Sequence, residues 1–171
     1  TEKLVSYWTR QNEINTLYNE RSHIAMFDKE FKDMAGKTVL DIGCGYGRIW
    51  DYLISQRGAR VWGVDICEES IKFVNGRSYQ GIVADARKLP FKDNSFDIVF
   101  SLGVVEHFKE TQEALLEHFR VCRKGGEVVV VVPNIVSPYS LSYCYHFLRG
   151  LHKMGLAVFG KRYSSKILKR M

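Results

Sequence analysis

Three closely spaced glycines and two acids are the residues of this sequence whose spacing most suggests chemistry. In the segment VLDIGCGYG, Gly43, Gly45 and Gly47 alternate with other residues, and Asp41 stands two places before the first glycine. A second acid, Asp65, follows the apolar run VWGV. Glycine adopts positive φ angles without strain and has no Cβ that would hold a ligand away from the main chain. The pattern predicts a loop that binds a nucleotide-like ligand against its backbone.

The spacing and charge of this loop separate two classes of ligand. A dinucleotide site has the pattern G-x-G-x-x-G and holds a pyrophosphate at a helix N-terminus. Here the spacing is G-x-G-x-G, and Arg48 stands where that pattern has its third glycine. The Asp41 carboxylate would repel phosphates at short range but would favour a cationic ligand. S-adenosylmethionine fits this description, because it carries an ammonium and a sulfonium and no phosphate.

The segment VLDIGCGYG also resembles the first motif of class I S-adenosylmethionine-dependent methyltransferases. Three later segments resemble further motifs of that family, in the same order: VWGVDI, VADARKLPFKDNSFDIVFSLGVVEHF and RKGGEVVVVVP. The likeness covers residues 36–134. A lone glycine loop is a weak signal, whereas four motifs in register are a strong one.

The resemblance implies roles for individual residues. Asp65 would bind the ribose diol, and Asp41 would favour the ammonium end, directly or through water; each acid has a helix cap as its alternative role. Asp85 and Ala86 would lie beside the adenine edge, and Ile66 against the adenine face. The predicted cofactor-binding residues are Asp41, Gly43, Cys44, Gly45, Gly47, Asp65, Ile66, Asp85, Ala86 and Leu102. The Cys44 side chain is expected to pack and not to act as a nucleophile.

The reaction implied is methyl transfer by in-line displacement at the sulfonium carbon, in which proximity and alignment supply much of the catalysis. The candidate base is His107, in VVEHF, with a packing or capping role as the alternative. Its neighbour Glu106 would orient it or bind the acceptor. His118, His146 and His152 are expected on helix surfaces.

The acceptor expected is a small molecule or a lipid-linked compound, but the sequence does not name it. One alternative is a truncated, non-catalytic domain that binds cofactor or a partner. Another is a nucleic-acid methyltransferase, which is disfavoured because SLGV stands where many amino-methylating enzymes have an NPPY-like tetrapeptide. An oxidoreductase is disfavoured by Asp41 and Arg48.

The elements that would position these residues alternate between strands and helices. Apolar runs predict five strands, and helical spacing predicts four helical segments between and before them. The strands are expected at 37–42, 60–66, 80–86, 96–104 and 127–133, and the helices at 3–33, 47–58, 68–76 and 110–126. Continuous Val/Ile strands that alternate with helices indicate a Rossmann-like, doubly wound, mostly parallel α/β sheet with helices on both faces.

The organisation expected is one domain with an N-terminal helical cap (1–35), a cofactor-binding core (36–134) and a basic, aromatic helical tail or substrate cap (135–171). The usual C-terminal antiparallel hairpin of the family is not evident, so the chain is either truncated or closed by this tail. The N-terminal segment carries aromatics that are candidates to cover the cofactor, namely Tyr7, Trp8, Tyr18 and Phe27.

The composition is that of a globular protein of 171 residues with a formal net charge of +6. Residues 138–171 hold seven Lys or Arg and no acid, which makes contact with an anionic membrane surface an additional candidate role. The four cysteines form no C-x-x-C pair and have no zinc-like spacing. They predict reduced thiols in a cytoplasmic protein without a metal.

Overall fold

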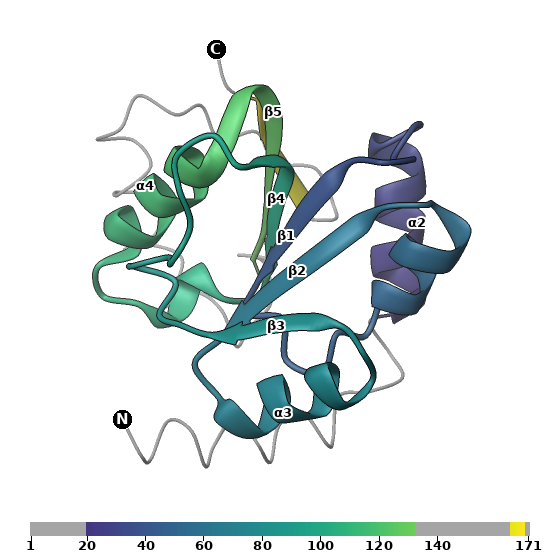
Figure 1. The fold of residues 1–171 in the computed structure, drawn as a ribbon. Coiled ribbons are helices and arrows are strands. Elements are labelled where there is room, and N and C mark those ends of the chain that lie inside the picture. The colour runs from purple at the N-terminus through teal and green to yellow at the C-terminus, as the bar shows by residue number, and fades with distance from the viewer. Residues whose placement is uncertain (1–19, 133–164, 170–171) are drawn as a thin grey trace, which may run out of the picture. The chain divides into compact units, whose positions relative to one another are not determined.

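The computed structural model describes residues 20–132 and 165–169, drawn as coloured ribbon in Figure 1. Contacts within the chain divide it into two compact units, residues 1–85 and 86–171, and each unit is described by itself. The first unit contains α2 (Glu20–Glu30), β1 (Thr38–Ile42), η1 (Tyr52–Gln56), β2 (Arg60–Asp65), α3 (Glu68–Gly76) and β3 (Gln80–Val83). The second contains β4 (Phe96–Leu102), η2 (Val105–His107), α4 (Thr111–Val121), β5 (Cys122–Val131) and β6 (Ser165–Lys169).

The strands of the first unit are parallel and lie in the order β3-β2-β1. Val39 pairs with Val61 and Ile42 with Val64, so β1 and β2 end side by side. Side chains from both faces of β1 are buried, as expected for strands that are covered on both sides. The ends of β1 and β2 therefore bring the glycine loop, which follows β1, and Asp65, the last residue of β2, to one edge.

In the second unit, β4 and β5 are parallel, and β5 pairs with β6 in the antiparallel direction. Val99 lies opposite Val128 and Leu102 opposite Val131, which brings the residues after β4 to the end of this ladder. The runs IVF in β4 and VVV in β5 are buried. The parallel, helix-connected strands of both units confirm the predicted α/β class.

The helix predicted over 47–58 is mostly not α-helical. Residues 43–49 form turns, and the helical part that follows is the π-helix η1, in which Arg57 N donates to Tyr52 O at 3.2 Å, five residues earlier. The chain then leaves through Gly58 at a φ of 66°. Positive φ angles in the loop keep its residues out of a regular helix, so the element starts later and is shorter than its sequence pattern suggests.

Two further boundaries differ from the sequence-based expectation. The basic segment predicted to end the helix at 110–126 belongs to β5, because α4 ends at Val121 and Cys122 is already extended. Gly125, with a φ of 73°, lies where the register of β4 and β5 shifts. In the tail, 165–169 form an antiparallel strand and not a helix, because their backbone pairs along β5.

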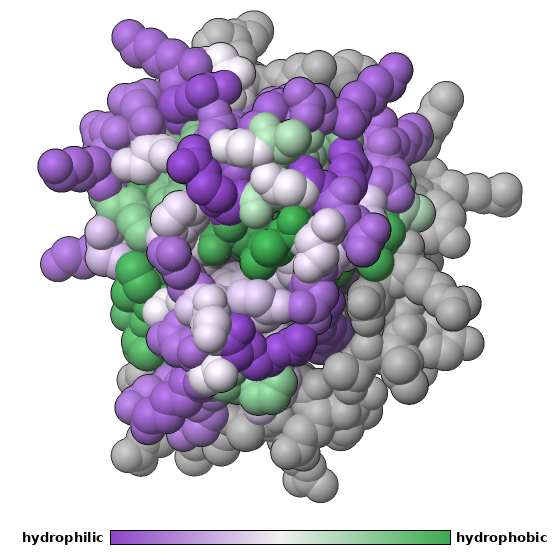
Figure 2. Space-filling view, turned by 45° about the vertical axis from the view of Figure 1, so that its right-hand side comes forward, coloured by the Kyte–Doolittle hydropathy of each residue, from purple (hydrophilic) through white to green (hydrophobic). Residues whose placement is uncertain are grey.

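The surface view in Figure 2 shows mostly hydrophilic residues, with hydrophobic ones in small separate areas. The large hydrophobic residues that are exposed in the described part are Ile66, Phe73, Ile82, Val83 and Leu116. No helix among the described residues is long and apolar enough to cross a membrane. The division into a 1–35 cap, a 36–134 core and a 135–171 tail stays a prediction, as does membrane contact through 138–171, which lie largely outside the described residues.

Candidate active site

The glycine loop turns away from β1 while its first amides stay bonded to the neighbouring strand. Gly43 N and Cys44 N both donate to Val64 O in β2, at 2.8 and 3.0 Å. Gly43, Gly45 and Gly47 have φ angles of 72°, 52° and 65°, in the left-handed region that favours glycine. The conformation predicted from the three glycines is therefore present.

Trp50, which the sequence reasoning did not single out, forms the inner wall of this loop. Its side chain is fully buried, and a Cβ added to Gly63 in β2 would lie 2.2 Å from Trp50 Cζ2. A Cβ on Gly47 would lie 2.9 Å from Trp50 Cδ2. The indole therefore fits between a loop glycine and a strand glycine. An isolated glycine inside a strand pattern, as in VWGVD, was the available signal for this close approach.

Asp41 lies beneath the loop, and its side chain is held by Trp50. Asp41 is 5% exposed, and its Oδ2 accepts a hydrogen bond from Trp50 Nε1 at 2.8 Å. Burial raises the pKa of Asp41 to about 7; the bond from Trp50 opposes the shift, and the negative charge of Asp65 adds to it. The two acids identified from the sequence are thus close enough to interact, and Asp41 titrates near neutral pH.

Asp65 joins the loop to the end of β2. Its Oδ2 accepts from Gly45 N at 2.8 Å, and its Oδ1 accepts from Cys67 N at 2.9 Å. Burial raises the pKa of Asp65, while hydrogen bonds from the main chain of Cys67, Gly45 and Ile66 oppose the rise. The carboxylate therefore fixes the central glycine of the loop and also begins the turn into α3.

The remaining predicted residues of the first unit lie near this turn or beyond β3. Cys44 is buried, and burial together with the charges of Asp41 and Asp65 raises the pKa of its thiol, in keeping with a packing role. Ile66 is 39% exposed although it is large and apolar, so its face is open for contact. Asp85 is half-buried at the end of the unit.

The second unit holds the other predicted residues. Ala86 is buried at the start of the loop before β4, and Leu102 is the half-buried last residue of β4. After Gly103, whose N–H donates to Val131 O at 2.8 Å, the chain forms the short 3-10 turn η2 that contains Glu106 and His107. The candidate base is therefore fixed next to the end of the strand.

Glu106 and His107 lie close together, and burial favours the uncharged form of both side chains. His107 Nε2 lies 3.9 Å from Glu106 Oε1, and the Glu106 side chain is 9% exposed. Burial raises the pKa of Glu106 to about 7 and lowers the pKa of His107, the latter against a hydrogen bond to Gly103. Burial thus favours the neutral form of the His107 imidazole. Glu106 Oε2 is buried without a hydrogen-bond partner among the described residues.

His118 corrects another expectation, because it lies in the core and not on a helix surface. It is fully buried in α4, and its Nδ1 lies 2.7 Å from Ala114 O, so Nδ1 carries the proton. Burial lowers its pKa to about 4. His146, His152 and the candidate covering residues Tyr7, Trp8 and Tyr18 lie outside the described residues. Phe27 is buried and packs against Phe31, as a core residue does.

The comparisons with known proteins define the class to which this chain belongs. A family model described as a methyltransferase domain matches residues 40–130, so the chain is a member of the methyltransferase-domain family. The matched segment begins in β1 before the glycine loop and ends in β5. The resemblance to class I S-adenosylmethionine-dependent methyltransferases is therefore confirmed.

Individual relatives differ in the acceptors that their names indicate. The chain is 34% identical over 100 residues to human probable tRNA methyltransferase 9B, covering 57% of this chain and 21% of that protein. It is 32% identical to a probable S-adenosylmethionine-dependent methyltransferase of Mycolicibacterium smegmatis, covering 77% of this chain and 48% of that protein. It is 29% identical to the ubiquinone biosynthesis O-methyltransferase of Pseudomonas paraeruginosa, covering 75% of this chain and 58% of that protein. The chain thus spans between about a fifth and just over half of these relatives.

Solved structures show the same fold over most of the chain. A Methanococcus maripaludis protein assigned to the S-adenosylmethionine-dependent methyltransferases matches with a TM-score of 0.76 and 15% identity, covering 97% of this chain and 93% of that one. Haemonchus contortus phosphoethanolamine N-methyltransferase 2, in complex with S-adenosylhomocysteine, matches with a TM-score of 0.65 and 24% identity over 79% of this chain and 36% of that one. The predicted Rossmann-like, doubly wound fold is confirmed.

Proposed function

We propose that this chain binds S-adenosylmethionine and transfers its methyl group to a small-molecule or lipid-linked acceptor. One observation carries most of the proposal. In a member of the methyltransferase-domain family, the acid that ends β2 is bonded to the central glycine of the loop after β1, Asp65 Oδ2 to Gly45 N at 2.8 Å. The loop and the acid identified from the sequence are therefore joined by a hydrogen bond.

The glycine loop and Asp65 together fit an adenosine-bearing ligand. A carboxylate has about four acceptor sites, and the main-chain groups of Gly45, Cys67 and Ile66 use three of them at Asp65. One site remains for a ribose hydroxyl without loss of an existing bond. Gly43, Gly45 and Gly47 have no Cβ atoms that would hold a ligand away from the loop main chain. Both features support the ribose and loop contacts that the family resemblance implies.

Asp41 supports binding of the ammonium end of the cofactor. It is buried with a pKa of about 7, and a nearby cation favours the ionised form of a carboxyl group. We therefore expect the affinity for a cationic amino-acid group to rise as the pH increases through 7. Asp85, Ala86 and Ile66 stay the predicted adenine contacts, and Leu102 stays a predicted cofactor-binding residue.

On the acceptor side, the proposed roles belong to His107 and Glu106. The cofactor supplies an electrophilic methyl group, and the protein needs a base only where the acceptor must lose a proton. Burial lowers the pKa of His107 and so favours the neutral imidazole, which is the form that accepts a proton. The unpartnered Oε2 of Glu106 suits an N–H or O–H donor on the acceptor.

The cofactor proposal is tested by calorimetric titration with S-adenosylhomocysteine. We expect the wild type to bind and Asp65→Ala to bind at least about tenfold more weakly, because a ligand hydrogen bond to a charged group is lost. Asp51→Asn is the matched control, because Asp51 is an exposed acid of the same unit bonded to Tyr79 and Arg77. Absence of wild-type binding, or equal losses in both variants, would refute the proposal.

A tRNA acceptor is the second candidate, favoured by the similarity to human probable tRNA methyltransferase 9B. The acceptor class is resolved by transfer of a radiolabelled methyl group from S-adenosylmethionine to total RNA, to a lipid extract and to a small-molecule extract of the same cells. Label in the lipid or small-molecule fraction that is lost in Glu106→Gln supports the first candidate. Label in RNA, with binding that falls steeply as salt increases, supports the second.

A further inference from the structure

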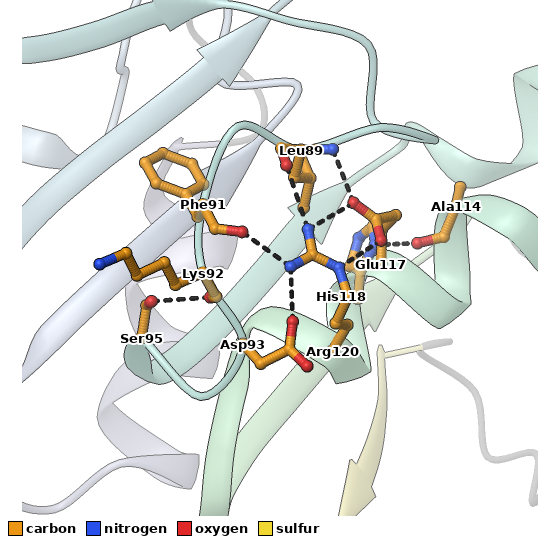
Figure 3. A network of polar contacts seen from close by, with 9 residues as sticks. All are labelled: Leu89, Phe91, Lys92, Asp93, Ser95, Ala114, Glu117, His118 and Arg120. Carbon is orange, nitrogen blue, oxygen red and sulfur yellow. Dashed lines mark hydrogen bonds and ion pairs between the residues drawn. The ribbon is translucent and has the colours of Figure 1, made fainter.

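The loop that begins at Ala86 and leads into β4 is held in place by several polar contacts. Residues 86–95 contain turns but no helix or strand, although Ala86 and Leu89 are buried. A loop without a backbone ladder needs other partners for its main-chain groups. Figure 3 shows that these partners come from the last turns of α4, with Arg120 at the centre.

Arg120 uses all five of its N–H donors. Its Nε and Nη2 donate to the two carboxylate oxygens of Glu117, at 2.5 and 2.7 Å. The other donors point into the loop: Nη1 to Phe91 O at 2.7 Å and Asp93 Oδ1 at 2.8 Å, and Nη2 to Leu89 O at 3.1 Å. Only the planar, forked guanidinium has five donors in this arrangement, so a lysine could make only part of the set.

Glu117 also contacts the main chain of Leu89, at the amide and not at the carbonyl that Arg120 binds. Its Oε2 accepts a hydrogen bond from Leu89 N at 2.7 Å. Leu89 is therefore held through its carbonyl by Arg120 and through its amide by Glu117. The bonds to Arg120 lower the pKa of Glu117, so the carboxylate stays ionised at neutral pH.

Both ends of the loop are also anchored. At the β4 end, Asn94 N donates to Arg120 O at 2.9 Å, and Ser95 N donates to Val121 O at 2.8 Å. At the start, Arg87 Nη1 lies 3.0 Å from Glu110 Oε2, and its guanidinium lies 5.2 Å from the centre of the Phe108 ring. Arg87 and Leu89, which follow Ala86 in the loop, are thus both held by contacts.

These contacts position the loop more than they hold α4 in the fold. The helix already buries Ala114, Leu115 and Val121, whereas the side chain of Arg120 is 30% exposed and that of Asp93 is 66% exposed. Partly exposed ion pairs contribute little to global stability. Three acceptors of Arg120 nevertheless belong to the loop, and two of them are main-chain carbonyls, whose positions define the loop conformation.

We propose that Arg120 is a positioning residue for cofactor binding, which with Glu117 holds the 86–95 loop that begins with Ala86, a predicted adenine contact. The inference rests on the proposed function, because it gives Arg120 a role in binding the cofactor of that function. Loss of the arrangement leaves a folded protein whose loop must be ordered at the moment of binding. The cost of that ordering reduces affinity.

The test is calorimetric titration of the 171-residue chain with S-adenosylhomocysteine, together with hydrogen exchange across 86–95. Arg120→Gln is expected to weaken binding roughly three- to thirtyfold. Glu117→Gln and Arg120→Lys are expected to give smaller losses, the latter as a partial rescue. Exchange should accelerate in 86–95 and stay slow in the buried turns of α4. Arg123→Gln is the matched control, because the side chain of Arg123 pairs with Asp97 of β4 at 2.6 Å.

Each outcome separates this inference from the function on which it rests. If the wild type does not bind S-adenosylhomocysteine, the proposed function fails, and the inference fails with it. If the wild type binds and folded Arg120→Gln binds equally well, even with a lowered Tm, only the positioning role is overturned. Should Arg120→Gln not fold, unchanged affinity in both Glu117→Gln and Asp93→Asn overturns it in the same way.

Discussion

Trp50 and Asp41 form the buried polar contact on which the glycine loop rests. The indole Nε1 donates to Asp41 Oδ2 at 2.8 Å, and both side chains are almost fully excluded from solvent. Close approach of Trp50 to Gly47 and Gly63 fixes the indole on either side. The tryptophan therefore links the loop, the strand β2 and the acid proposed to favour the cofactor ammonium.

The first prediction concerns the glycine in β2. Gly63→Ala places a methyl group 2.2 Å from Trp50 Cζ2, so the indole that donates to Asp41 must shift. We expect a loss of about 1–3 kcal/mol in the free energy of unfolding, as for other overpacked cores, measured by urea denaturation. Affinity for S-adenosylhomocysteine should fall as well.

Gly76→Ala is the control for this substitution, because a Cβ at Gly76 meets no atom within 4 Å and the residue lies in α3. Alanine is favoured over glycine in helices, so this variant should be as stable as the wild type or slightly more stable. A Gly63→Ala protein with wild-type stability would show that the indole does not fill the space against β2.

The second prediction concerns the pH dependence that Asp41 gives to stability. Its pKa is raised from 3.8 to about 7, so the folded state binds the proton more tightly than the unfolded state. The stability gained from this proton is complete below pH 4 and is lost as the pH rises to 7. Asp41→Asn should remove that loss, and its stability relative to the wild type should increase by roughly 3 kcal/mol across the interval.

Denaturation curves at half-unit pH steps measure this difference. Asp51→Asn serves as the control, because the pKa of Asp51 is lowered by its bonds to Tyr79 and Arg77, and no gain between pH 4 and 7 is expected. Parallel stability profiles for the wild type and Asp41→Asn would contradict a buried, proton-binding Asp41.

The third prediction has the opposite sign and concerns His118. Its pKa is lowered from 6.5 to about 4, so the unfolded state binds the proton more tightly. Stability is then complete above pH 6.5 and is lost as the pH falls to 4, by roughly 3 kcal/mol. His118→Leu should abolish this acid loss. Leu115→Ala in the same helix is the control and should lower stability by an amount that does not depend on pH. If His118→Leu lost stability between pH 6.5 and 4 as the wild type does, the role given to His118 would be excluded.

The features that the sequence predicted and the structure contains share one property, a strong local pattern. Apolar runs located the strands, and the three glycines together with Asp65 located the loop and its bonded acid. Trp50 was missed because its importance comes from Gly63, thirteen residues later and in another strand. The glycine in VWGVD carried that information, since an isolated glycine in a strand often marks a close approach.

Other parts of the site depend on contacts that no local pattern encodes. His118 was placed on the surface by its residue type, although Ala114, His118 and Val121 follow the spacing of a buried helix face. The hydrogen bonds of Arg120 to the 86–95 loop join residues about thirty positions apart. The π-helix at Tyr52–Gln56 comes shortly after a loop with three glycines at positive φ, which helix propensity does not describe.

The most direct test of the central claim is a crystal structure of the chain with bound S-adenosylhomocysteine. The account predicts that the ligand lies over the main chain of Gly43 to Gly47 and that a ribose hydroxyl donates to the Asp65 carboxylate at about 2.5–3.0 Å. A ligand bound elsewhere, or a ribose out of hydrogen-bond reach of Asp65 while Gly45 N keeps its bond, would contradict it.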